Sequence, residues 1–258
     1  MINEFWNYAK GKSDDLFALR FRPGTDTAMA FATAVAFSSV YYAGSHTASS
    51  LVSFLLFTVL GTALLCVVLP AFYVLVVRRE PLGALGITTR RWRLALGLSA
   101  FFAAGSFPGL LSPMAQNPDV DLLPHLLVNG LSLWEPFFVY GWLQVRFERA
   151  FGVLPGMALA ALCFGAYHVG TFPLTGVLAL TGFGLLYAAL FQAAGANLLV
   201  LWPLTWAVGS GIGTLQGGFG FSWDFVPVVA VLLAVQVMAI AGFARFARAG
   251  NSGMDHRG

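Results

Sequence analysis

Two ionisable side chains stand in runs of sequence that are otherwise apolar. Glu135 opens the run "EPFFVYGW" (135–142), and His168 follows "CFGAY" (163–167). An ionisable group at the depth of a lipid bilayer costs several kcal/mol, so each is a candidate functional residue. A carboxylate and an imidazole supply two thirds of a catalytic zinc site, in which zinc-bound water becomes a nucleophile near neutral pH. The sequence therefore predicts Glu135 and His168 as catalytic residues and as ligands of one zinc ion.

The helices that carry these residues should bring them to nearly the same depth. Glu135 lies 11 residues before Arg146, where its span is expected to end, which is about 16 Å of helix. His168 lies 13 residues beyond Pro155, near the start of the next span, which is about 20 Å. Consecutive antiparallel helices would then let the two side chains meet. Pro136 removes a backbone donor beside Glu135 and can kink the helix, which opens room for a ligand or water.

A structural role explains the same pair equally simply. A protonated Glu135 that hydrogen-bonds His168 or a neighbouring hydroxyl would hold two helices together. Two protein ligands are also fewer than the three that a catalytic zinc normally takes. Both readings stay open at the level of the sequence.

Aromatic side chains close to the pair have two readings. Tyr140 and Tyr167 are near enough in sequence to Glu135 and His168 to line a cavity with a polar tip. Like Trp134 and Trp142, they also suit packing or a membrane interface.

The remaining histidines and cysteines carry weaker signals. His46 and His125 fall near external ends of predicted spans, where a hydrated histidine needs no special role. Cys66 and Cys163 fall inside spans and are expected to be small buried residues. Asn197 opens a span and is expected to cap a helix.

The composition places the chain in the membrane. Of 258 residues, 58% are apolar and only 10% are charged, and the mean hydropathy is +0.78. A helix needs roughly 20 apolar residues to cross the hydrocarbon core. The sequence predicts an all-α polytopic protein with one bundle of about eight spans, at 27–44, 51–77, 94–111, 124–145, 155–171, 175–193, 197–213 and 225–244.

The fourteen basic residues indicate the orientation of these spans. They precede the first span or lie in the connections after the second, fourth and eighth spans, whereas the loops at 45–50, 112–123, 172–174 and 214–224 contain none. By the positive-inside rule, both termini are expected in the cytoplasm of a multi-pass plasma-membrane protein. The net charge of +3 is then a topology signal, and nothing in it suggests nucleic-acid binding.

The sequence predicts three segments along the chain. Residues 1–26 are expected to form a cytoplasmic lead-in without the apolar core of a cleaved signal peptide, 27–248 the transmembrane domain, and 249–258 a flexible tail. The connection at 78–97 mixes five arginines with apolar residues, so it is either a membrane-surface segment that faces anionic headgroups or an ordinary loop. Membrane lipid is the first expected partner.

The segments "EPFFVYGWLQVRFERAFG" and "CFGAYHVG" resemble the first two motifs of the CPBP intramembrane metalloprotease family, which includes the type 2 CAAX prenyl proteases. Glu135 and Gly141 match the first motif, and Phe164 and His168 match the second. The resemblance covers roughly residues 80–213. It implies a helical membrane fold, a metal-dependent endopeptidase activity, and a membrane-associated or prenylated peptide as substrate.

Three positions depart from the family pattern. Pro136 replaces a second glutamate, Tyr140 replaces an arginine, and Trp206 or Ala207 stands where the third motif has a histidine. A third zinc ligand would have to come from Thr205, Ser210, water or a distant histidine, and hydroxyls are poor zinc ligands. Tyr140, Phe164, Tyr167, Thr205 and Trp206 are predicted to line the cavity around the site as supporting residues.

Three functional hypotheses remain. The chain is a weakened intramembrane peptidase, or a homologue that has lost proteolysis and acts as a lipid-phase binding, immunity or regulatory protein. The third hypothesis, a transporter or channel, would need a polar path on several helices. Only Glu135 and His168 are predicted to lie deep in the membrane, which counts against a transporter.

Overall fold

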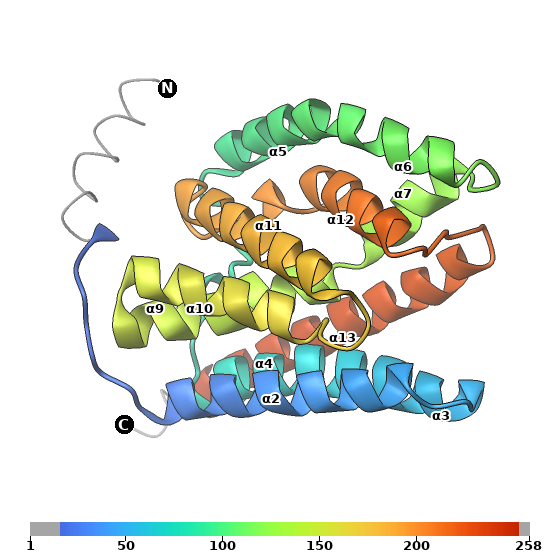
Figure 1. Ribbon diagram of the computed structural model, residues 1–258. Helices are drawn as coiled ribbons and strands as arrows, with labels where there is room; N and C mark the ends of the chain where they lie inside the picture. The colour runs from blue at the N-terminus through green and yellow to red at the C-terminus, as the bar shows by residue number, and fades with distance from the viewer. Residues whose placement is uncertain (1–15, 253–258) are drawn as a thin grey trace.

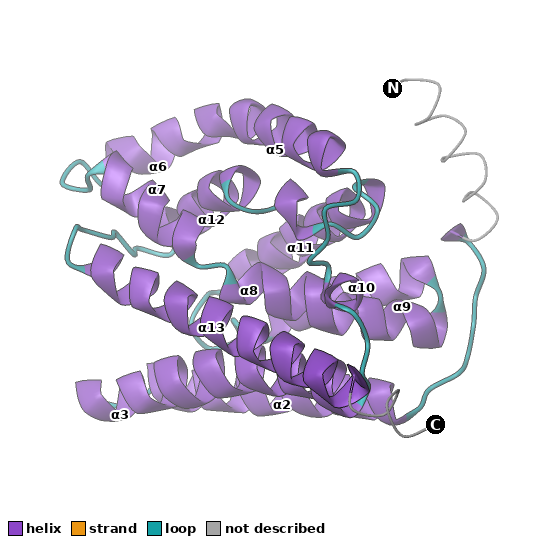
Figure 2. Cartoon of the chain, turned by 180° about the vertical axis from the view of Figure 1, so that it is seen from behind, coloured by secondary structure: helices purple, strands orange, loops and turns teal. Residues whose placement is uncertain are grey.

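The protein is built from helices. A computed structural model describes residues 16–252, and within that range the regular elements are all helical (Figures 1 and 2). The α-helices are α2 (Thr25–Ser45), α3 (Ser50–Phe54), α4 (Leu69–Phe72), α5 (Trp92–Ser106), α6 (Leu111–Gln116), α7 (Leu122–Leu131), α8 (Trp134–Pro136), α9 (Val145–Phe151), α10 (Val153–Ala166), α11 (Leu174–Ala193), α12 (Leu204–Gln216) and α13 (Phe225–Ser252). The π-helices are η1 (Leu55–Val68), η2 (Tyr73–Val77) and η5 (Phe137–Gln144), and the 3-10 helices are η3 (Leu82–Leu85), η4 (Phe107–Leu110) and η6 (Leu198–Val200).

Four of the predicted spans are long and apolar enough to cross a membrane. Among the described residues these are Ser50–Val77, Trp92–Gln116, Leu174–Ala193 and Phe225–Ala249. Helices of this length and composition are typical of integral membrane proteins. The other predicted spans are shorter, less apolar or interrupted, so the count of eight and the orientation of the termini remain predictions.

The prediction of one continuous span over 124–145 is wrong. The helix α7 ends at Leu131, and a second helix runs from Trp134 through η5 to Phe151. The break follows from the sequence, because Pro136 has no N–H to give to Ser132 and is favoured only in the first turn of a helix. Glu135 therefore lies at the beginning of a helix rather than in the middle of one.

The predicted span at 197–213 is also interrupted. The short helix η6 ends at Val200, and α12 begins at Leu204, after Pro203. Asn197 caps η6 as expected, since its side chain accepts a hydrogen bond of 3.0 Å from the Leu199 N–H.

Segments that carry basic residues meet at one end of the bundle. Asp26 at the start of α2 pairs with Arg78 at 3.2 Å, and Glu80 accepts hydrogen bonds from Arg146 at 2.9 Å and Arg149 at 2.8 Å. In Figure 1 the start of α2, the α9–α10 turn and the C-terminal part of α13 lie toward this end, and the α6–α7 and α12–α13 turns lie toward the other. The segments with basic residues, which the sequence places on one side of the predicted spans, thus lie toward one end of the bundle.

The hairpin formed by residues 134–168, from α8 to the two residues that follow α10, lies at the centre of the core. Gly152 makes its turn with φ +97°, where an added Cβ would meet the Ala18 carbonyl oxygen, so only glycine fits. Figures 1 and 2 show α11 on one face of the molecule and α13 on the opposite face. Phe37 of α2 is fully buried against Phe138 and Tyr167 of the hairpin, at ring-centroid distances of 5.6 and 5.0 Å.

Candidate functional site

The hairpin carries Glu135 and His168 at the open ends of its two arms. Glu135 lies 17 residues before Gly152 and His168 lies 16 residues after it. At the rise of an α-helix, the two arms are each about 25 Å long. Because the arms are nearly equal in length, their open ends lie at nearly the same level. The matched depth expected from the sequence therefore has a structural basis, although the basis is a turn at Gly152 and not two separate spans.

His168 lies just beyond the last turn of α10, half-buried among aromatic rings. Its ring is 4.1 Å from that of Tyr167 and 5.9 Å from that of Tyr41, measured between centroids. The Nδ1 atom lies 2.8 Å from the carbonyl oxygen of Phe164. A carbonyl can only accept, so Nδ1 carries the proton and Nε2 of the neutral ring is left as an acceptor.

Glu135 sits among side chains from four other elements. Tyr41, Cys66, Tyr140 and Tyr187 all lie within electrostatic range of its carboxyl group. Within residues 16–252, no hydrogen bond or ion pair engages the carboxyl oxygens. Tyr41 is shared by both candidate residues, since its ring also contacts His168. Glu135 and His168 thus border one aromatic compartment, and a direct contact between them stays a prediction.

Tyr140 and Trp206, which stand at two of the three positions that depart from the family pattern, lie in one cluster of aromatic rings. Trp206 is 1% exposed, and its indole lies 5.4 Å from the Tyr187 ring, 6.0 Å from Phe164 and 6.3 Å from Tyr140. Tyr140 is fully buried, and its hydroxyl donates to the Gly184 carbonyl at 3.4 Å. The predicted supporting residues Tyr140 and Phe164 thus both contact the indole of Trp206 through their rings.

Two polar atoms in this region are buried without a partner. The indole Nε1–H of Trp206 and the hydroxyl of Tyr167 form no hydrogen bond within the described part of the chain. Buried donors are usually satisfied by protein, water or ligand. These two atoms are available to an acceptor that enters the compartment.

The hydroxyls considered as a third ligand are engaged elsewhere. The Thr205 hydroxyl donates to the Ser99 carbonyl of α5 at 3.0 Å. The Ser210 hydroxyl donates to Asn129 Oδ1 at 2.7 Å. The side chain of Thr205 therefore points toward α5 and that of Ser210 toward α7.

A catalytic zinc ion does not fit the donors that the structure offers. The bond from His168 Nδ1–H to a carbonyl is the arrangement of a metal-binding histidine, with Nε2 free to bind. Among residues 16–252, however, no group of three His, Cys, Asp or Glu side chains could hold a metal ion. A zinc site with three protein ligands cannot be built from Glu135, His168 and the indole of Trp206.

The sequence missed a buried polar network around His125. This side chain is fully buried, so the expectation of a hydrated interfacial histidine is wrong. Its Nδ1 accepts from the Phe221 N–H at 3.4 Å, and Nε2 therefore carries the proton toward the Gly211 carbonyl at 3.0 Å. Asn129 and Thr214 complete the network between α7 and α12. The spacing of His125 and Asn129, four residues apart on one helix, was the available signal.

The expectations for His46 and Cys66 are confirmed. His46 is exposed and stacks on Tyr42 with ring centroids 4.1 Å apart. Cys66 is buried and Cys163 half-buried, and both are free thiols. The lead-in at 1–15 and the last residues of the tail, 253–258, lie outside the described residues, and α13 continues to Ser252.

Long apolar helices around a buried hairpin that carries a glutamate and a histidine define the general class, a helical integral membrane protein. The family model Rce1-like, described as type II CAAX prenyl endopeptidase Rce1-like, matches residues 115–207. This segment contains Glu135, His168 and Trp206, and the match confirms the family resemblance. No curated protein and no solved structure matches the chain.

Proposed function

We propose that this Rce1-like membrane protein binds a membrane-associated ligand, such as a lipid-modified peptide, without metal-dependent hydrolysis of a peptide bond. The observation that carries the proposal is the position of Trp206. The family resemblance expects a histidine at Trp206 or Ala207, and the Trp206 indole packs at 6.0 Å against Phe164 of the second motif. An indole ring has no lone pair to offer a metal, so a third protein ligand is missing there.

The compartment has groups that suit binding. Trp206 Nε1–H and the Tyr167 hydroxyl are buried donors without partners, and a ligand carbonyl would satisfy them. Glu135, which has no hydrogen bond among the described residues, can accept from a ligand N–H. The surrounding rings provide the apolar part of the surface.

Binding without cleavage is tested with a farnesylated peptide that carries a photoreactive group. The peptide is cross-linked to the purified full-length protein, and its mass is followed over the same period. We expect specific cross-linking, reduced by unlabelled peptide, and an unchanged peptide mass. Release of a shortened peptide by the wild-type protein, but not by Glu135→Gln, would contradict the proposal.

Peptide hydrolysis by Glu135 and His168 alone is the second candidate. It is favoured by the unengaged carboxyl group of Glu135 and by the free Nε2 of His168 at the open end of the same hairpin. In such a reaction, Nε2 of His168 would hold a water by accepting one hydrogen, and Glu135 would take the other proton as the water oxygen attacks the peptide carbonyl carbon. Glu135 would then give that proton to the leaving amine as the C–N bond breaks. The same mass measurement distinguishes the two functions.

A further inference from the structure

A large groove lies beside the hairpin and is lined by other residues than those of the aromatic compartment. Its volume is about 940 Å³, and it is bordered by α13, the segment 79–89 and the region around η6. This is near the upper limit for small-molecule sites in proteins. Leu133 and Phe137 line the groove but Glu135 does not, so the groove is separate from the candidate pair.

One face of α13 forms a wall of the groove along its whole length. The α13 residues that line it are Gln236, Val237, Ile240, Ala241, Ala244, Ala247 and Arg248. Steps of three and four residues keep these side chains on a single helix face. From Gln236 to Arg248 the face extends over 12 residues, or about 18 Å. One leaflet of a bilayer core measures about 15 Å, half of the total thickness.

The two ends of this face differ in charge. Arg248 and Arg79 line the groove at the end where the basic segments gather, and both are exposed. No ion pair engages either guanidinium within residues 16–252. Glu80 also lines this end, but its carboxylate accepts hydrogen bonds from Arg146 and Arg149. The rim therefore presents two arginines without a compensating acid.

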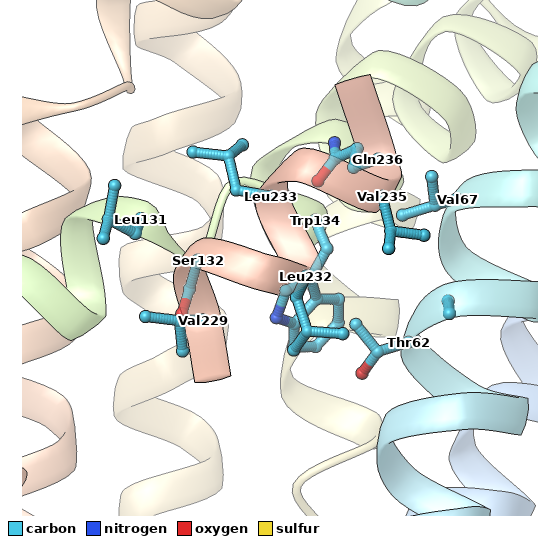
Figure 3. A pocket seen from close by; sticks show the side chains of 11 residues that line it. Thr62, Val67, Leu131, Ser132, Trp134, Val229, Leu232, Leu233, Val235 and Gln236 are labelled. Carbon is cyan, nitrogen blue, oxygen red and sulfur yellow. The ribbon is translucent and has the colours of Figure 1, made fainter. Parts of the chain in front are cut away.

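The other end of the groove is closed by Gln236. This side chain is 3% exposed, and its Nε2 has no hydrogen-bond partner in the described part of the chain. Gln236 also borders a small cavity between η1 and α13, together with Thr62 and Trp134 (Figure 3). The groove thus runs from a basic rim to the middle of the bundle, with apolar walls between.

From these observations we infer that the groove is a binding site for an anionic glycerophospholipid of the leaflet at the basic end. Arg79 and Arg248 bind the phosphate, for which the guanidinium is the preferred partner. One acyl chain lies along Val237, Ile240 and Ala244, where the small alanine side chains leave room for it. Basic pockets between membrane helices commonly select anionic lipids. This site does not depend on the ligand of the Glu135 compartment.

The inference is tested by native mass spectrometry of the full-length protein. The protein is released from membranes that contain equal amounts of phosphatidylglycerol and phosphatidylcholine with the same acyl chains. With two arginines at the rim, we expect phosphatidylglycerol to be retained about tenfold over phosphatidylcholine. The double variant Arg79→Gln/Arg248→Gln should retain the two lipids about equally.

Matched variants separate the groove from general charge effects. Arg90→Gln/Arg245→Gln removes the same charge from exposed positions outside the groove and should keep the preference. Ala244→Trp fills the groove and should abolish retention of both lipids, whereas Ala234→Trp, on an exposed part of α13, should not.

Three results would overturn the inference. They are equal retention of both lipids by the wild type, a preference that survives in Arg79→Gln/Arg248→Gln, and full retention in Ala244→Trp. Displacement of phosphatidylglycerol by soluble glycerol phosphate would show a phosphate site that does not need the acyl chain, and it would also overturn a lipid site.

Discussion

The indole of Trp206 packs against the ring of Phe164 with centroids 6.0 Å apart. Phe164 belongs to the motif that ends at His168, so Trp206 packs against the helix that leads to His168. Tyr140 and Tyr187 complete the contact. Trp206, at one of the two positions where the resemblance expects a histidine, thus contributes to the packing of the hairpin against α11 and α12.

A histidine at position 206 should create a metal site. Trp206→His places an imidazole beside Phe164, as a third donor next to Glu135 and His168. We therefore expect the zinc content of the purified protein to rise from background to about one ion per chain, as for three protein ligands. The large-to-small change leaves a cavity, and we expect a loss of about 3 kcal/mol in stability. Zinc content is measured by elemental mass spectrometry beside a thermal melt.

The matched control for this variant is Ala207→His. Ala207 is directed toward α7, where its Cβ lies 3.2 Å from the position that a Cβ on Gly130 would occupy. A histidine there should bind no zinc. Equal zinc uptake by both variants would mean that Trp206 does not occupy the third-ligand position.

Glu135 and His168 should matter for the ligand and not for membrane insertion. Glu135→Gln removes the carboxylate acceptor, and His168→Ala removes the ring that borders the same compartment. The loss of a hydrogen bond to a charged group should weaken cross-linking of the farnesylated peptide about tenfold or more. His46→Ala, at an exposed histidine, is the control. Undiminished cross-linking in both site variants would show that the pair does not form the binding site.

The cluster at the basic end should make stability depend on pH. Burial raises the pKa of Glu80, but the hydrogen bonds and charges of Arg149 and Arg146 outweigh this effect, and the pKa lies below its usual value. A lowered folded-state pKa means that Glu80 stabilises the fold above its ordinary pKa of about 4.3. This stabilisation is lost as the pH falls through the folded-state pKa.

Thermal melts between pH 7 and pH 3 test this prediction. Glu80→Gln should lower the melting temperature at pH 7, because it leaves the buried Arg146 with one acidic partner fewer, at a cost on the order of 3 kcal/mol. It should also reduce the fall in melting temperature on acidification. Asp119→Asn, in an exposed turn, should keep the wild-type profile. An acid profile of Glu80→Gln identical to that of the wild type would contradict the assignment.

The network between α7 and α12 should be a source of stability. Ser210→Ala removes the 2.7 Å hydrogen bond to Asn129 Oδ1, and we expect a loss of about 1 to 3 kcal/mol since a buried acceptor is left unpaired. Ser39→Ala, where an exposed serine bonds only to its own helix, should change stability by less than about 0.5 kcal/mol. Equal melting temperatures of the two variants would contradict a stabilising network.

The sequence was sufficient where one local pattern decides the outcome. Long apolar runs predicted the four helices that can cross a membrane. The resemblance around Glu135 and His168 is confirmed by the family match. Each apolar run and each of the two motifs is read within a window of about 20 residues, the length of one span.

The sequence was insufficient where contacts between distant segments decide the outcome. The burial of His125 depends on Gly211 and Phe221, about 90 residues away in the chain. The prediction of a single span over α7 and the following helix used only the apolar character of the segment. It did not take into account that Pro136 restricts where the second helix can begin. The role of position 206 required the structure, which shows Trp206 against Phe164 and Ala207 toward Gly130.

The most direct test of a metal-free site is the zinc content of the detergent-purified wild-type protein, measured by elemental mass spectrometry beside Glu135→Ala and His168→Ala. We predict no zinc above background in any of the three proteins, since Trp206 offers no third ligand. About one zinc ion per wild-type chain that is absent from both variants would contradict this prediction and would make Glu135 and His168 ligands of a catalytic metal.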